Sequence, residues 1–511
     1  MFFSKQKCPP EQLRNENILK CLVTGTRFLF YNEVLVRPRK GPQIWNQEKG
    51  DLVDMASEKK ERASFSGRLG YVLATAGSAV GLGNIWRFPY LAAKYGGGIF
   101  ILVYIILAAT FGYTMIVTET ALGRKTRKSP VGAFSFFTKK KMGAVGGWMN
   151  AVIPMIIVPY YSVIGGWVLR YFVEYVRGNG ASLAEDTYFS GFIGNAAGSE
   201  IFFLIFAALN ILVIGMGVNG GVERVSTVMM PSLIVLAVIV AVYSVTRPGA
   251  LAGVHYIFVP DFSKFSIMTV VAAMGQMFYS LSIAMGILYT YGSYMKDDVD
   301  VESSSYQVVL VDSCVAILAA LMIIPSVFAF SGADAAQNLQ AGPSLLFITL
   351  PKVFASMAGG RIFGILFFLM VLFAALTSSI SLLETSVSTL EDEAHMNRTG
   401  ATVFMFAVMI VLGSLSSFGY NILSGARIVG MQFLDFFDFL SNSLMMPISA
   451  FTTCLLVLRA AGVRVVIDEV GKSSKFRMRK MYSLSIRYFA PVLLVIIFLS
   501  SVLSALGIIS M

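Results

Sequence analysis

The sequence predicts an all-α integral membrane protein, and three observations support this fold class. Charged residues make up only 14% of the chain, whereas a soluble domain has about 25%. Hydrophobic residues make up 56% of the 511 positions, more than soluble cores could bury. The apolar residues also gather in runs long enough to cross the roughly 30 Å hydrocarbon layer as helices. A soluble globular protein is therefore excluded.

Eleven such runs follow one another along the chain, and each is predicted to be a transmembrane helix. Each run is mostly apolar and is bounded by charged residues or by Gly and Pro. The predicted spans are 68–91, 97–122, 147–176, 200–216, 222–245, 266–294, 303–331, 360–391, 400–417, 433–459 and 485–509.

The basic residues between the spans predict how the chain is oriented. Seven Lys and Arg lie in the loop after the second span, between residues 124 and 141, and the loop 460–484 before the last span is also basic. Because loops of this kind stay in the cytoplasm, we expect a cytoplasmic N-terminus, and the odd number of spans places Met511 outside. The net charge of +11 therefore indicates membrane topology, and no nucleic-acid partner is expected.

The first and sixth predicted spans contain polar interruptions. Span one has Gly77, Gly81 and Gly83 beside Asn84, and span six is interrupted between 275 and 286. Glycines at this spacing could form a helix-packing face, but packing does not explain an Asn, an Arg and a Pro in the same span. Interrupted helices at matching positions, five spans apart, indicate an inverted five-plus-five repeat plus a final helix, with a transport site at the bilayer midplane.

The predicted organisation has six parts. Residues 1–54 are polar and lack a helical period, and two interpretations remain open. They are an artefact of a start placed too far upstream, with Met55 as the true start, or a disordered cytoplasmic tail. The other parts are a cytoplasmic segment 55–67, repeats 68–245 and 246–459, a basic cytoplasmic loop 460–484 and the final helix 485–511.

Several motifs resemble the neurotransmitter:sodium symporter family, and the similarity covers residues 62 to 509. The clearest motif is the run from Gly77 to Tyr90 in span one. Others are Glu119 with Gly123-Arg124, Tyr160-Tyr161, Gly275-Gln276, Leu376-Thr377-Ser378-Ser379 and Glu391-Asp392-Glu393. Eleven spans are similar to many bacterial members. The resemblance implies a sodium-coupled symporter, not an enzyme, that works by alternating access in the bacterial inner membrane.

The resemblance also implies two sodium ions bound beside the broken helices. Sodium 2 would be held by carbonyls of Gly77 and Val80 and by Ala374, Thr377 and Ser378 of span eight, since a hard cation needs several oxygen ligands. The alternative for the two hydroxyls is hydrogen bonding to the preceding helical turn.

Sodium 1 would be held by Ala79, Asn84, Ser280 and Asp312. Asp312 is an intramembrane carboxylate. A charged group inside a membrane costs free energy, so such a residue is expected to have a function.

A chloride site is implied only in part. Chloride-dependent relatives use a Tyr, a Gln and two Ser, which match Tyr104, Gln276 and Ser280, but Ala316 stands at the second Ser position. Our hypothesis is that the Asp312 carboxylate supplies the missing negative charge and makes transport chloride-independent.

Gly81 narrows the range of possible substrates, because it stands where monoamine transporters of the family have Asp. Without that carboxylate, the substrate is expected to bring its own, as an amino acid does. The mostly apolar lining favours a neutral, hydrophobic or aromatic amino acid. The implied contacts are Ser78, Ala79, Leu82, Gly83, Ile157, Tyr161, Tyr279, Ser280, Ser282, Met285, Ser378 and Leu382.

Four charged residues match the family's gates. Arg87 and Asp438 would close the outer side, and Arg62 and Asp392 the inner side, while Glu119 would accept hydrogen bonds from the unwound backbone of span six. The alternative for charges near span ends is snorkelling to the interface.

One rival function stays open at this point. An amino-acid-binding membrane sensor would use the same binding residues without transport. A channel would need a continuous polar pore, and a pump would need a nucleotide-binding motif that the chain lacks. The expected partners are an amino acid and the lipid bilayer, and the oligomeric state is left open.

Overall fold

The computed structural model describes residues 62–138, 141–331 and 343–505, and these residues form α-helices joined by short loops. The predicted segment 1–54, and residues 55–61 of the predicted cytoplasmic segment, lie outside this range. In the described residues, β structure is limited to two isolated bridges. The all-α fold class is therefore confirmed.

Among the described residues, nine helices are long and apolar enough to cross a membrane. Their bounds lie within a few residues of the predicted spans, except that the last begins six residues earlier and ends nine residues earlier than predicted. These helices are Gly98–Thr126, Ala144–Arg177, Ala196–Gly215, Val218–Val245, Val301–Phe330, Gly360–Glu393, Arg398–Phe418, Phe433–Ala461 and Arg479–Ser500.

The remaining two spans are broken helices, and each half alone is too short to cross a bilayer. Span one consists of α4 (Arg68–Ala79), a π-helical turn (Gly83–Arg87) and α5 (Phe88–Lys94). Span six consists of α15 (Ile267–Ser280) and α16 (Ile287–Tyr294). With these two, the described residues contain the eleven predicted spans, and the breaks fall where the sequence placed them.

The backbone at the second break is strained. Ser282 and Ala284 have φ angles of 53° and 62°, and a left-handed backbone costs roughly 1–2 kcal/mol for such residues. Surrounding contacts must therefore hold this loop in place, and they are described below.

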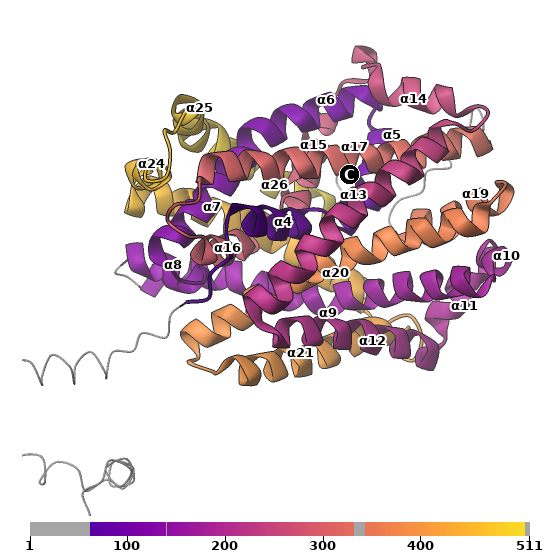
Figure 1. Cartoon of the computed structure of the whole chain (residues 1–511), viewed down its shortest axis with the longest axis horizontal. Coiled ribbons are helices and arrows are strands. Elements are labelled where there is room, and N and C mark those ends of the chain that lie inside the picture. The colour runs from indigo at the N-terminus through magenta and orange to yellow at the C-terminus, as the bar shows by residue number, and fades with distance from the viewer. Residues whose placement is uncertain (1–61, 139–140, 332–342, 506–511) are drawn as a thin grey trace, which may run out of the picture. The chain divides into compact units, whose positions relative to one another are not determined.

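Helix α9 (Lys141–Arg177) lies at the centre of one group of spans (Figure 1). It packs along α20 (Gly360–Glu393), α12 (Ala196–Gly215) and α21 (Arg398–Phe418). α20 forms span eight and α9 forms span three, so these two spans lie side by side. Both reach the region of the helix breaks.

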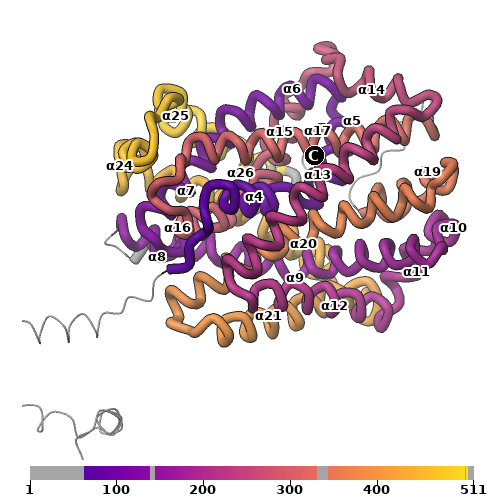
Figure 2. The backbone as a smooth tube through the Cα atoms, in the orientation of Figure 1, coloured from indigo at the N-terminus to yellow at the C-terminus, as the bar shows by residue number. Residues whose placement is uncertain are grey.

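Helix α4 lies among spans from both repeats (Figure 2). It packs against α13 (Arg224–Val245), α17 (Val301–Ser331) and α20. Since α4 leads directly into the break of span one, this packing brings the break against spans seven and eight.

Short helices occupy several connections that were predicted only as loops. None of these helices is long enough to cross the bilayer, so no apolar run of span length predicts them. The predicted loop 460–484 contains one of them and also includes α25 (Arg479–Leu484). The longer of these connection helices are α8 (Pro130–Phe137), α11 (Asp186–Gly194), α14 (Ala250–Phe258), α19 (Leu350–Ser356) and α24 (Val463–Val470).

Candidate functional site

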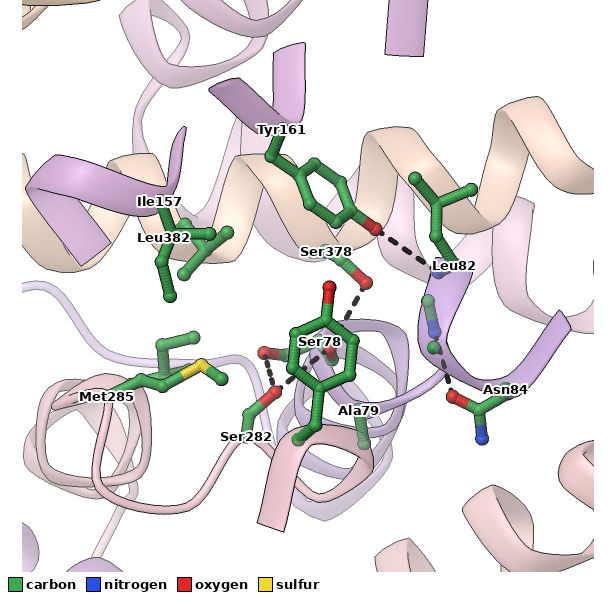
Figure 3. Close-up of a pocket in the computed structure, with 14 residues that line it drawn as sticks. Ser78, Ala79, Leu82, Asn84, Ile157, Tyr161, Ser282, Met285, Ser378 and Leu382 are labelled. Carbon is green, nitrogen blue, oxygen red and sulfur yellow. Dashed lines mark hydrogen bonds between the residues drawn. The ribbon is translucent and has the colours of Figure 1, made fainter. Parts of the chain in front are cut away.

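The two helix breaks meet at a small internal cavity of about 30 Å³ (Figure 3). This volume has room for water. Eleven of the twelve predicted substrate-contact residues line it, together with Gly81, Asn84 and Ile287. Ser280 is not among the lining residues, because its hydroxyl is hydrogen-bonded to Asp312 instead.

Hydrogen-bonding groups of the two breaks gather on one side of the cavity (Figure 3). The Leu82 N–H donates to the Tyr161 hydroxyl at 3.2 Å. The Ser282 hydroxyl donates to the Ser78 carbonyl at 3.0 Å. This side can therefore bind a polar group with main-chain and hydroxyl groups, without a lining carboxylate.

Apolar side chains lie on the other side of the cavity. Ile157, Met285 and Leu382 approach one another there (Figure 3), and each is at most 4% exposed. Met is flexible and adapts to irregular shapes, so this side suits an apolar side chain of variable size.

Two glycines of span one lie against side chains from other spans. A Cβ added at Gly81 would lie 2.7 Å from the Ser378 hydroxyl and 3.1 Å from the Tyr161 hydroxyl. A Cβ at Gly83 would lie 2.4 Å from the Tyr279 ring. A side chain at either position would enter the space around the cavity.

The predicted sodium 2 ligands come together between spans one and eight. The Ser378 hydroxyl lies 3.3 Å from the carbonyl oxygens of Gly77 and Val80. A Cβ added at Gly77 would lie 3.2 Å from Thr377 Cβ, so the two helices approach closely. The Thr377 hydroxyl donates to the Phe373 and Ala374 carbonyls of its own helix. This is the hydrogen bonding to the preceding helical turn that the sequence left open as the alternative to sodium binding. Carbonyl and hydroxyl oxygens of this kind fit a hard cation.

Asp312 lies at the centre of the predicted sodium 1 residues and is fully buried. Its carboxylate accepts hydrogen bonds of 2.8 Å from Asn84 Nδ2, from the Tyr104 hydroxyl and from the Ser280 hydroxyl. A buried carboxylate needs such partners. The carboxylate oxygens and the Asn84 amide oxygen provide ligands that suit sodium.

Gln276 joins the two breaks directly. Its side-chain Nε2 donates to the Gly83 carbonyl at 3.0 Å, at the start of the π-helical turn that follows the break in span one. The Gln276 side chain is fully buried. The sequence named it in a family motif and among groups that match a chloride site, without a contact to span one.

Glu119 supports the strained loop of span six. Its Oε1 accepts a hydrogen bond of 3.0 Å from the Ala284 N–H, and the side chain is fully buried. The sequence assigned this contact to Glu119, and the structure places the two groups together at the strained residue itself.

The inner pair of predicted gate residues is in direct contact. Arg62 Nη1 lies 2.7 Å and 2.8 Å from the two carboxylate oxygens of Asp392. Arg62 also donates to the hydroxyls of Ser293 and Ser388. Through these contacts, Arg62 connects the segment before span one to spans six and eight.

The outer pair differs from the expected direct contact. Within the described part of the chain, Arg87 forms no ion pair with Asp438, and its guanidinium lies 5.6 Å from the centre of the Tyr279 ring. The Asp438 carboxylate instead accepts hydrogen bonds from Tyr160 and Asn442. Sequence reasoning missed Asn442, although it follows Asp438 by one helical turn.

Comparisons with known proteins show which family this chain belongs to. The family model of the Sodium:neurotransmitter symporter family matches residues 62–181 and 193–508. The Bacillus subtilis sodium-dependent transporter YhdH is 32% identical over 87% of this chain and 98% of its own length. A sodium-dependent transporter of Haemophilus influenzae is 31% identical over 88% of this chain and all of its own length.

A solved structure is similar as well. The crystal structure of MhsT in complex with L-phenylalanine superposes with a TM-score of 0.78 at 34% identity, over 86% of this chain and all of that chain.

Proposed function

Since the chain belongs to the sodium:neurotransmitter symporter family and is a sodium-dependent transporter, we propose that it imports a neutral, hydrophobic or aromatic amino acid. The cavity between the helix breaks is the observation that supports this most directly. One side offers main-chain and hydroxyl groups for an α-amino acid, and the other offers Ile157, Met285 and Leu382 for its side chain. The phenylalanine bound to MhsT supports the same substrate class.

Two sodium ions accompany the substrate in this proposal. Sodium 1 binds at Asp312, Asn84, Ala79 and Ser280, next to the polar side of the cavity. Sodium 2 binds at Gly77, Val80, Ala374, Thr377 and Ser378. Sodium fixes the broken helices, and its binding favours one state over the other, which is what drives a conformational cycle.

The transport cycle starts from the contacts of the two gates. The inner pair, Arg62 and Asp392, is bridged, while Arg87 and Asp438 are not in direct contact. This combination is consistent with a state that is closed toward the cytoplasm. Substrate binding then closes the outer gate, and opening of the inner pair releases the substrate inside.

We further propose that transport is independent of chloride. The Asp312 carboxylate contacts Tyr104 and Ser280, two of the groups that match a chloride site in relatives, and it supplies a fixed negative charge there. An uptake rate that falls steeply when gluconate replaces chloride would contradict this part.

The protein is a multi-pass membrane protein. We propose the bacterial inner membrane as its location, with the N-terminus in the cytoplasm and the C-terminus outside, because basic loops stay inside. Impermeant labelling of single cysteines in the loop 124–141 and in the loop 178–195 tests this orientation.

Uptake into proteoliposomes tests the function as a whole. Labelled amino acids, from alanine to tryptophan, are supplied with and without an inward sodium gradient. We expect concentrative uptake of hydrophobic or aromatic amino acids only with the gradient. Binding of an amino acid without any accumulation would favour the alternative, a membrane sensor.

A further inference from the structure

An open cavity of about 470 Å³ lies at the start of the final helix, far along the chain from the transport site. All its lining residues come from about three turns of one helix, formed by α25 (Arg479–Leu484) and the π-helical turn Ser485–Phe489. The lining residues are Arg479, Lys480, Ser483, Leu484, Arg487 and Tyr488.

Three cations line this cavity. Arg479, Lys480 and Arg487 are exposed, and in the described ranges none of them takes part in a hydrogen bond or an ion pair within the chain. The acidic Glu302 of α17 accepts hydrogen bonds from the main-chain N–H groups of Arg477 and Met478. Glu302 thereby fixes the chain just before the cluster and uses both of its carboxylate oxygens to do so.

The preceding segment is also held firmly. Arg124 of α7 (Tyr113–Thr126) forms a fully buried ion pair with Glu469 of α24 at 3.0 Å, and Lys472 pairs with the same carboxylate at 2.8 Å. The three cations therefore sit on an anchored helix start, where a ligand does not have to order a free loop.

The same helix exposes an apolar face beyond the cations. Val492 is 59% exposed and Leu499 is 53% exposed, and both lie in α26 (Ala490–Ala505). Tyr488, at 64% exposed, stands between the cations and this face, where aromatic side chains gather at a membrane interface. A ligand that fits needs a negative headgroup and a long apolar tail.

We propose that this helix start is a binding site for an anionic phospholipid, with the lipid phosphate at Arg479, Lys480 and Arg487. The acyl chains lie along the exposed apolar face of α26. Charge complementarity favours an anionic headgroup over a zwitterionic one, and the adjoining apolar face favours a lipid over a soluble phosphate.

Native mass spectrometry of the full chain in detergent tests the proposal. Phosphatidylglycerol and phosphatidylcholine with identical acyl chains are added separately, and the retained lipid is counted. We expect preferential retention of phosphatidylglycerol that weakens as ionic strength rises, because salt screens exposed charges. Equal retention of the two lipids by the wild type would overturn the proposal.

A triple variant locates the site. The variant Arg479→Gln, Lys480→Gln, Arg487→Gln should bind phosphatidylglycerol about a hundredfold more weakly, since each cation near an anionic lipid contributes about a factor of five. The matched control Arg459→Gln, Arg464→Gln, Lys475→Gln loses the same charge from the same region outside the cavity and should bind like the wild type. Equal loss in both triples would mean general electrostatic attraction and would contradict a site.

Two further arms complete the test. The charge-conserving variant Arg479→Lys, Arg487→Lys should retain the lipid, so weak binding by the first triple cannot be ascribed to misfolding. Millimolar inorganic phosphate should leave the bound lipid in place. If phosphate displaces it, the site binds a soluble anion and the lipid proposal is wrong.

Discussion

The hydroxyl of Tyr104 donates a 2.8 Å hydrogen bond to the carboxylate of Asp312, although the two residues are 208 positions apart in the chain. The same carboxylate also contacts Asn84 and Ser280. One buried carboxylate thus joins spans one, two, six and seven next to the cavity.

Replacement of this charge should change the ion dependence of transport. In Asp312→Asn the shape is kept but the negative charge is lost, so we expect uptake to require chloride and to fall at least about tenfold in gluconate, the scale of a lost charged hydrogen bond. Uptake rates in chloride and gluconate media measure this. The exposed Asp298→Asn is the matched control, and a chloride-independent Asp312→Asn would contradict the chloride hypothesis.

Asn84 should be essential for sodium-dependent uptake. Its amide donates to Asp312 and accepts from the Gly81 N–H, so Asn84→Ala removes a predicted sodium ligand and frees the backbone of the break. We expect sodium-driven uptake to disappear in proteoliposomes. Asn210→Ala removes a buried amide that bonds only within its own helix, and this control should retain transport. Full activity of Asn84→Ala would defeat the assignment of sodium 1.

Asp438 should be required for transport although it is not bridged to Arg87. Its carboxylate holds Tyr160 at 3.1 Å and Asn442 at 2.6 Å on the outer side of the cavity. We expect Asp438→Ala to abolish sodium-dependent uptake, whereas Asp261→Ala, which changes an exposed acid outside the site, should not. Wild-type uptake rates in Asp438→Ala would remove this residue from the gate.

A side chain at Gly81 should obstruct the substrate site. A Cβ there would lie 2.7 Å from the Ser378 hydroxyl, so Gly81→Ala must push Ser378 or narrow the cavity. We expect binding of the amino acid to weaken by about tenfold or more, the order of effect of overpacking. Isothermal titration or scintillation proximity binding measures it. Gly220→Ala has open space around its Cβ and should bind like the wild type, and equal affinities in both would argue against a site at Gly81.

Loss of the inner ion pair should favour opening toward the cytoplasm. Asp392→Asn removes the charge that Arg62 contacts twice, and the segment 62–67 should then exchange amide hydrogens faster, since Phe65 N–H is bonded to the Tyr294 carbonyl. Hydrogen-exchange mass spectrometry measures this directly. Asp297→Asn breaks an exposed ion pair with Arg127, which contributes little, and should leave the segment unchanged. Unaltered exchange in Asp392→Asn would contradict a gating role for the pair.

Local sequence was sufficient for the spans but not for the short helices. A run of about 20 apolar residues is visible without any partner, and so are the glycines and amides that weaken spans one and six. Short helices such as α24 were missed because they contain no long apolar run. Contacts with other elements hold them in place, among them the buried Arg124–Glu469 ion pair.

The candidate site shows the same division. The resemblance of the motifs named Ser280 as a substrate contact and expected Arg87 to pair with Asp438. In the structure Ser280 bonds to Asp312 and Arg87 lies over Tyr279. Differences of this kind depend on side-chain direction and on the conformational state, and neither is encoded in residue spacing.

The sequence by itself determined that this is a membrane protein with eleven spans, two of them broken, because hydrophobic length and helix-breaking residues are local properties. The tertiary structure decided which polar groups meet in the membrane. Asp312, Glu119 and Gln276 each bond to a group far away in the chain. An unpaired polar group is costly in a layer without water, and the packing of the spans brings these partners together.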